Sequence, residues 1–344
     1  MSVRRTRPRP IIIPNARKNV DLQTPPHLGN LTPDLQPNSP PVFPCATQHE
    51  VARLGQYILT EPLDGEDVYQ AVNIHTHEKF ICKVYDIHAY RQQLRAYWSV
   101  DYDADCINHI TEIILGETKA YAFFEKNFGD LHTHVRNERK LKEREAKKLF
   151  AQIVRAVQRC HENGIVLRDL KLRKFVFQDE LRKKLKLEGL EDSFVLEDEH
   201  DDSMRDKHGC PAYVSPEILC ANTPYSGKAA DMWSLGVILY TMLFGRYPFH
   251  DTEPSALFRK ILRGQYNVPE TVSSKARCLI RSLLRQDPSE RLTADEVLRH
   301  PWFRTGSTFT VLQRSERKNL DQEVPDVYVE SDEDDVDDDF APGL

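Results

Sequence analysis

The order of the hydrophobic patterns along this chain constrains its fold more than any other feature. Strand-like alternation runs from Leu54 to about Lys83, and the apolar run 120–124 is typical of a short buried strand. Further on, apolar residues recur every three or four positions over 141–163, and 229–243 is apolar enough for a buried helix. Strands followed by helices predict an α+β fold of two lobes, a small β-rich N-lobe and a large α-rich C-lobe.

Composition changes sharply at the two ends of the 344-residue chain. The first 50 residues hold ten of the 21 prolines, the first 20 hold six bases and no acid, and 330–339 holds eight acids and no base. We therefore predict a disordered, proline-rich basic arm over 1–52, one domain over 53–305 and a disordered acidic tail over 306–344.

The bulk composition also bounds the function. A net charge of -6 argues against general nucleic-acid binding, and no apolar run is long enough to span a membrane. The seven cysteines are scattered without metal-ligand spacing, which predicts reduced thiols in a protein of the nucleus or cytoplasm.

Short motifs between these segments follow one another in the order and at the spacing of a protein kinase. They are Ile81-Cys82-Lys83, Leu167-Arg168-Asp169-Leu170-Lys171, Gly189-Leu190-Glu191, Ser215-Pro216-Glu217, Asp231-Met232-Trp233 and Glu290-Arg291-Leu292. The segment from about 55 to 305 therefore resembles a protein kinase domain end to end. The resemblance implies that Lys83 stands where a kinase contacts nucleotide phosphates and Asp169 where it orients the substrate hydroxyl.

The residue types are wrong at each position where phosphoryl transfer needs a metal ligand. Lys174 stands where a kinase has a magnesium-binding asparagine, and Gly189 where it has the magnesium-binding aspartate. A cation repels a metal ion, and glycine has no side chain to ligate one. We expect no metal site, weak or absent ATP binding, and no catalysis, with Lys83, Asp169 and Lys171 as remnants.

The phosphate-covering loop and the helix that follows Lys83 depart from the kinase pattern as well. The three glycine positions of the loop fall on Glu61, Leu63 and Glu66. The glutamate that a kinase pairs with its strand lysine is missing, since none lies between Val84 and Thr111. We therefore predict a short or distorted helix and a Lys83 without its usual partner.

The scaffold positions of the kinase pattern survive. Glu217 is expected to form a buried ion pair with Arg291, and Asp231 lies on the buried helix that anchors the catalytic loop. Asp169 is compatible with catalysis and equally with a structural role that caps loop amides, and we favour the structural role.

The variant catalytic loop, the variant metal motif and the tail together resemble the Tribbles family of pseudokinases. The tail segment Asp321-Gln322-Glu323-Val324-Pro325-Asp326 is similar to the Tribbles motif that recruits a RING-type E3 ubiquitin ligase of the constitutive-photomorphogenic class. An extended backbone at Pro325 and an apolar anchor at Val324 suit a docking peptide. Two short stretches, 53–55 and 190–193, look most like the third vertebrate Tribbles branch.

A second Tribbles-like segment closes the domain. His300-Pro301-Trp302-Phe303 resembles the segment associated with MAP-kinase kinases. Such a sequence also closes many kinase domains, and we favour the alternative that Trp302 packs under the large lobe.

The resemblance implies an adaptor rather than an enzyme. It would deliver basic leucine-zipper factors of the CCAAT/enhancer-binding class for ubiquitination and degradation. Its other expected partners are MAP-kinase kinases and Akt-type kinases. We expect it in the nucleus and cytoplasm, with no binding to membranes and no direct binding to nucleic acid. Two alternatives stay open. One is a weak, metal-independent ATP-binding kinase that uses Lys83 and Asp169, and the other is a nucleic-acid-associated regulator that uses the basic arm.

Overall fold

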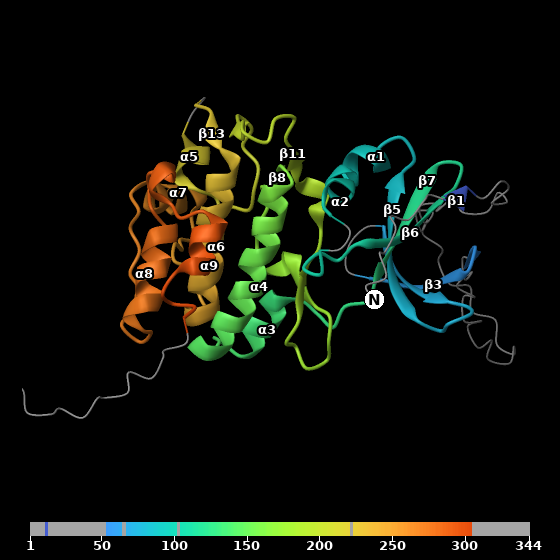
Figure 1. The fold of residues 1–344 in the computed structure, drawn as a ribbon, viewed down its shortest axis with the longest axis horizontal. Helices are drawn as coiled ribbons and strands as arrows, with labels where there is room; N and C mark the ends of the chain where they lie inside the picture. The colour runs from blue at the N-terminus through green and yellow to red at the C-terminus, as the bar shows by residue number, and fades with distance from the viewer. Residues whose placement is uncertain (1–10, 13–52, 64–66, 102–103, 221–222, 305–344) are drawn as a thin grey trace, which may run out of the picture. The chain divides into compact units, whose positions relative to one another are not determined.

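The computed structural model describes residues 11–12, 53–63, 67–101, 104–220 and 223–304. The predicted 1–52 arm, apart from residues 11–12, and the predicted 306–344 tail lie outside these ranges. Figure 1 shows the described part as a sheet, coloured blue to green, beside a larger group of helices, coloured green to red. This is the predicted two-lobed α+β fold.

The small lobe is built on one sheet with the strand order β1-β6-β7-β5-β4-β3-β2. Its strands are β1 (Ile11–Ile12), β2 (Arg53–Leu54), β3 (Tyr57–Pro62), β4 (Val68–Asn73), β5 (Lys79–Asp86), β6 (Ile110–Leu115) and β7 (Lys119–Glu125). Strands β2 to β5 and β7 confirm the predicted strand patterns. Strand β6 lay in a stretch whose pattern favoured neither helix nor strand.

Alternation along these strands buries one face of the sheet in a small apolar cluster. Tyr57 stacks on Phe123 with ring centroids 3.9 Å apart, and Phe80 meets Tyr57 edge-on. The opposite face of β5 and β7 belongs to the core that continues into the large lobe. Residues two apart on β5, such as Lys83 and Tyr85, therefore point together toward the large lobe.

Strand β1 was not predicted. It pairs in parallel with β6, with Ile11 opposite Ile114 and Ile12 opposite Leu115. The predicted basic arm therefore contributes a strand to the sheet at these two residues. Three isoleucines before Pro14 are too few for a periodicity, so the signal was the β-branched residue type alone.

The segment after β5 forms two short helices, as the missing helical pattern predicted. They are α1 (Tyr90–Gln93) and α2 (Arg95–Ser99), separated by Leu94. Tyr90, Leu94 and Tyr97 recur at helical spacing and are buried. Figure 1 shows both helices on the side of the sheet that faces the large lobe.

The large lobe is built around two helices whose patterns were predicted. Helix α4 (Glu143–Glu162) buries one stripe, whereas α6 (Gly227–Phe244) is buried on nearly all sides. Ser226 caps α6 by accepting a hydrogen bond from the Ala229 amide. The other helices of the described part of this lobe are α3 (Leu131–Asn137), α5 (Pro216–Leu219), α7 (Pro254–Leu262), α8 (Ser274–Leu283) and α9 (Ala294–Arg299).

Short paired strands hold the loops between these helices. They are β8 (Ile165–Val166), β9 (Phe175–Phe177), β10 (Leu185–Leu187), β11 (Phe194–Val195), β12 (Ser203–Met204) and β13 (Tyr225–Ser226). Strand β9 pairs with β10, and β8 with β11, so the catalytic-loop motif, between β8 and β9, and the Gly189 motif, between β10 and β11, connect the same two pairs of strands.

The described residues also bear on the cysteines and on membrane-spanning helices. The six cysteines among them are all free, which agrees with the prediction of reduced thiols. None of the helices in the described ranges combines the length and the apolarity needed to cross a membrane.

Candidate functional site

The fold brings the kinase-like residues together between the two lobes. Lys83 comes from β5, Asp169 and Lys174 from the loop between β8 and β9, and Gly189 from the loop after β10. A short 3-10 turn, Leu190–Asp192, follows Gly189 and lies against α1 and α2.

Lys83 has two carboxylate partners, both from the segment that carries Gly189. Its Nζ lies 3.0 Å from Glu191 Oε1 and 3.7 Å from Glu188 Oε1. The Tyr85 hydroxyl donates to the same Glu191 oxygen at 2.8 Å, and Lys83 Nζ lies 5.1 Å from the ring centroid of Phe124. Sequence reasoning showed that the helix glutamate is missing, but it did not identify Glu191 as the residue that pairs with Lys83 instead. Glu191 is more than 100 residues away from Lys83 in the chain.

Electrostatics keep this pair charged. Burial alone would lower the pKa of Lys83, but Tyr97, Glu191 and Glu188 outweigh it, so the pKa of Lys83 is raised. Burial likewise opposes ionisation of Glu191, yet Lys83 and the Tyr85 hydroxyl hold the pKa of that carboxyl below its usual range. A nucleotide phosphate would have to displace both carboxylates to reach the ammonium.

Tyr97 of α2 holds the Gly189 segment in place. Its hydroxyl accepts hydrogen bonds from the amides of Gly189, at 3.0 Å, and Leu190, at 3.2 Å. Leu190 itself is fully buried against this part of the core. The sequence signal for this contact was the helical spacing of Tyr90, Leu94 and Tyr97, which sequence reasoning missed.

Lys174 and Gly189, which stand at the two metal-ligand positions of a kinase, contact each other directly. Lys174 Nζ donates to the Gly189 carbonyl at 2.5 Å and to Asp192 Oδ2 at 2.9 Å. Gly189 has a left-handed φ of +76°, and a Cβ there would lie 3.0 Å from Lys174 Cδ and 3.2 Å from Nζ. The ammonium thus fills the space of the missing aspartate side chain, and these residues do not fit a magnesium ion.

The remaining acids of the site are dispersed among different partners. Glu188 Oε2 accepts from the amides of Asn108 and Asn127, Glu191 faces Lys83, and Asp192 faces Lys174. Within the described ranges, no group of three or more His, Cys, Asp or Glu side chains is placed to hold a metal ion.

The structure confirms the predicted anchoring of the catalytic loop by the helix of Asp231, but not the amide-capping role expected of Asp169. The Asp169 carboxylate pairs with Lys171 and lies 4.0 Å from Lys174 Nζ, with no loop amide bound to it in the described structure. The amides of Leu167 and Arg168 instead donate to Asp231, at 2.8 and 3.0 Å. The amide-capping role that we favoured for Asp169 is therefore wrong, and the cap is the buried aspartate on α6.

The phosphate-covering loop is only partly described. Glu61 and Leu63 are exposed at the end of β3, and the Leu63 amide donates to the Val68 carbonyl at 2.8 Å. This bond joins the end of β3 to the start of β4. Gly65 and Glu66 lie outside the described residues.

The predicted buried ion pair is present in bidentate form. Arg291 donates to Glu217 Oε1 at 2.6 Å and to Oε2 at 2.7 Å. Its remaining N–H groups bind the carbonyls of Ala229, Arg285 and Gln286. The guanidinium also lies 5.1 Å from the Trp233 ring centroid. All five donors are satisfied, as a buried guanidinium requires.

The His300-Pro301-Trp302-Phe303 segment packs as the structural alternative predicted. Trp302 is 1% exposed, and its Nε1 donates to Glu143 Oε1 at 2.8 Å. Phe303 stacks on Phe150 of α4, whereas Pro301 is exposed. In this structure Trp302 therefore belongs to the core and offers no surface to a partner.

A groove opens on the large lobe between α3, the end of α6 and α7. We call it the large-lobe groove. Its lining includes no carboxylate but several cations and aromatic side chains: Arg136, Arg139, Arg246, Lys260, Tyr240, Tyr247 and Tyr266. Of the cations, Lys260 pairs with Asp251 at 2.9 Å. Its charge suits an acidic peptide segment. The predicted ligase-docking residues, Asp321, Gln322, Val324, Pro325 and Asp326, lie outside the described residues.

Comparison with known proteins agrees with this geometry. Residues 65–303 match the family model described as the protein kinase domain. The chain is 56% identical to Tribbles homolog 2 of Bos taurus over 88% of its length and 87% of that protein's. It is 52% identical to Tribbles homolog 1 of Homo sapiens (86% and 82% covered) and 50% identical to Tribbles homolog 3 of Bos taurus (80% and 76% covered).

These sequence identities do not favour the third vertebrate Tribbles branch, which the stretches 53–55 and 190–193 suggested. They do extend over most of each protein and include the segment with Lys174 and Gly189. The chain therefore belongs to the Tribbles family and carries a domain of the protein kinase fold.

Proposed function

We propose that this chain is a pseudokinase adaptor. The observation that carries the proposal is the Lys174 ammonium, which lies on the Gly189 carbonyl in the space of a metal-binding side chain. Without bound metal, the charge that develops on a transferred phosphoryl group lacks its main stabiliser. The Glu217–Arg291 pair and the Asp231 cap support a retained kinase fold. Phosphoryl transfer is absent from this proposed function.

The adaptor would act by holding two proteins at once. The large lobe, with the large-lobe groove as its binding surface, would take a client protein, and residues 321–326 would recruit a RING-type E3 ubiquitin ligase. Tethering raises the local concentration of ligase around the client without any reaction by the adaptor. The clients we propose are basic leucine-zipper factors of the CCAAT/enhancer-binding class, with MAP-kinase kinases and Akt-type kinases as further partners, in the nucleus and cytoplasm.

A thermal-shift titration with ATP tests the first half of this proposal. Ligand that binds only the folded state must raise the melting temperature. We expect a small or no shift with ATP, and no larger shift when Mg²⁺ is added. A clear Mg²⁺-dependent shift, together with phosphoryl transfer that Asp169→Asn abolishes, would overturn it.

The second candidate function is a weak, metal-independent ATP-binding kinase. The retained Lys83 and Asp169 favour it, although Lys83 is held by Glu191. The same titration distinguishes the two, since a shift with ATP alone that Lys83→Met removes would support this candidate.

The ligase half is tested with Val324→Ala/Pro325→Ala in the full chain. We expect ligase pull-down to be lost and the melting temperature of the domain to stay the same, because a docking peptide contributes contacts to its partner. Unchanged ligase capture would remove this half of the proposal.

A further inference from the structure

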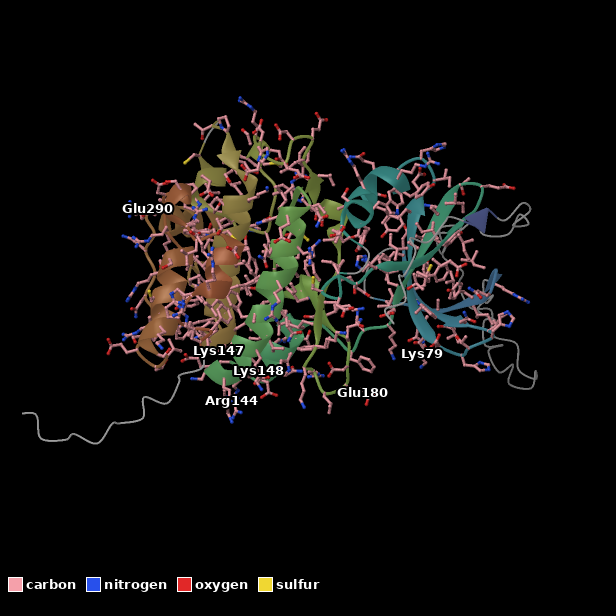
Figure 2. The ribbon with its side chains drawn as sticks, viewed as in Figure 1. Lys79, Arg144, Lys147, Lys148, Glu180 and Glu290 are labelled. Carbon is pink, nitrogen blue, oxygen red and sulfur yellow. The ribbon has the colours of Figure 1, made fainter. Side chains whose placement is uncertain are left out.

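The start of α4 carries a dense group of cations that the proposed function does not use. We call Lys140, Lys142, Arg144, Lys147 and Lys148 the α4 cationic face. All except the half-buried Lys147 are exposed. Figure 2 labels Arg144, Lys147 and Lys148 and shows them gathered at one end of α4. Arg144 is three positions from Lys147 and four from Lys148, so the three share one side of the helix.

The carboxylates nearest to this face form their hydrogen bonds with other residues, and Glu143 keeps a charge that attracts Lys147. Glu143 accepts from the Ser273 amide and hydroxyl, at 3.0 and 2.6 Å, and from Trp302 Nε1 at 2.8 Å. Glu145 Oε1 lies 3.0 Å from His134 Nε2. Among the described residues, the five cations of the face have no carboxylate within 4.0 Å of their charged nitrogens.

The position of these cations on the helix adds to their field. Helix N-termini carry a partial positive charge, which favours acids in the first turn and disfavours Lys and Arg there. Arg144, Lys147 and Lys148 fall in the first two turns of the 20-residue α4. The field of the helix end falls off within the first turn, so it disfavours Arg144 and adds to the attraction of that side chain for an anion, whereas Lys147 and Lys148 contribute their own charge alone.

Neighbouring elements extend the face. Gln152, one turn beyond Lys148, binds the Lys183 carbonyl at 2.9 Å and the Leu185 amide at 2.8 Å, which places the exposed Lys183 and Lys184 beside α4. On the other side, Arg139 lines the large-lobe groove and directly precedes Lys140. The cationic surface thus runs from the groove along α4.

We propose that the α4 cationic face binds an acidic polypeptide segment of a partner protein. Charge complementarity identifies the class of ligand, and continuity with the large-lobe groove allows one partner to use both surfaces. A single-stranded nucleic acid fits the α4 cationic face itself less well, because its five residues are aliphatic cations and single strands need aromatic side chains for base stacking. The ring nearest the face, Trp302, is buried beneath Lys147 at 5.6 Å.

The inference depends on the proposed function only in naming the ligand as a protein. The test measures binding of a fluorescent ten-residue peptide with eight carboxylates to the full chain at low salt. A second full chain, with the eight acids of 330–339 replaced by Asn or Gln, prevents the chain's own acids from competing. A matched Asn/Gln peptide and a single-stranded oligonucleotide of equal charge serve as comparison probes.

Lys140→Gln/Arg144→Gln/Lys148→Gln is expected to weaken binding of the acidic peptide about tenfold and to flatten its salt dependence. Lys79→Gln/Lys207→Gln/Arg263→Gln removes the same charge from exposed positions elsewhere and is expected to change little. Equal losses in the two triple variants, or tighter binding of the oligonucleotide than of the acidic peptide, would overturn the inference. Ligase capture through 321–326 is measured separately, so a failure here differs from a failure of the adaptor.

Discussion

At the scale of single residues, the Lys174 side chain leaves little room for a side chain at position 189. Gly189→Ala is expected to lower the free energy of unfolding by about 1–2 kcal/mol from left-handed backbone strain, with a further cost from the Lys174 contact. The control is Gly129→Ala, because Gly129 has a φ of +95° and nothing lies within 4 Å of its added Cβ. In a double-mutant cycle measured by chemical unfolding, Lys174→Ala should relieve part of the Gly189→Ala cost. Equal costs at Gly189 and Gly129 would contradict this account.

Arg291 is the residue whose loss should harm the large lobe most directly. Arg291→Ala leaves Glu217 without its partner, and breaking such a buried pair costs roughly 3–5 kcal/mol. Arg285→Ala is the control, since its pair with Glu290 spans 3.7 Å with both side chains more than half exposed. Thermal unfolding should show a large drop in melting temperature for the first variant and a small one for the second. Similar drops would show that the buried pair contributes little.

Glu191 gives the domain a defined acid sensitivity. Its pKa is lowered in the folded state, so its pairing with Lys83 stabilises the fold above the unfolded-state pKa near 4.5 and is lost as pH falls through the lower folded value. Glu191→Gln should therefore flatten the fall in unfolding free energy between about pH 5 and pH 3. The measurement is chemical unfolding across that range, with Glu290→Gln at an exposed pair as control. An unchanged slope in Glu191→Gln would exclude this pair as a source of acid sensitivity.

At the scale of elements, α2 acts as a clamp on the segment after β10. Tyr97→Phe removes the acceptor of two amide hydrogen bonds, which should cost about 1–3 kcal/mol because buried donors are left unpaired. Tyr90→Phe is the control, since among the described residues the Tyr90 hydroxyl bonds to the Arg91 side chain and to no buried amide. Hydrogen exchange should show faster exchange of the Gly189 and Leu190 amides in Tyr97→Phe alone. Unchanged protection of these amides would contradict the clamp.

Helices and strands differ in how clearly the sequence predicts them. Helices α4 and α6 were predictable because their burial patterns repeat within the helix itself. The Glu217–Arg291 pair was predictable from motif order alone. Helix α7 and strand β6 were missed because short elements with mixed residue types give weak periodic signals.

The contacts that define the site were harder to foresee. Glu191 on Lys83 and Lys174 on Gly189 each depend on how two loops meet, and no local pattern encodes such a meeting. Sequence reasoning showed which kinase ligands are missing, but not what replaced them. It placed the anchor of the catalytic loop correctly on the helix of Asp231, but it also expected Asp169 to cap loop amides, because a carboxylate there is compatible with that role on residue type.

At the scale of the whole molecule, the proposed adaptor requires both binding surfaces on one chain. The effective concentration that a tether supplies exists only when client and ligase bind the same molecule. A groove variant, Arg246→Glu/Gln265→Glu, places two carboxylates among cations in a groove that has none. A tail variant, Val324→Ala/Pro325→Ala, removes the ligase arm. Each alone is expected to abolish adaptor-dependent ubiquitination of the client.

Mixing the two variants separates a tether from an activator. If the chain acts as a tether, equal amounts of the groove variant and the tail variant should restore no client ubiquitination, because neither molecule holds both proteins. If binding of the chain instead activated the ligase or unmasked the client, the mixture would recover activity in trans. The unmutated chain should also inhibit the reaction at high excess, since client and ligase are then bound to different adaptor molecules. Recovery in the mixture, or no inhibition at excess, would rule out the tether mechanism.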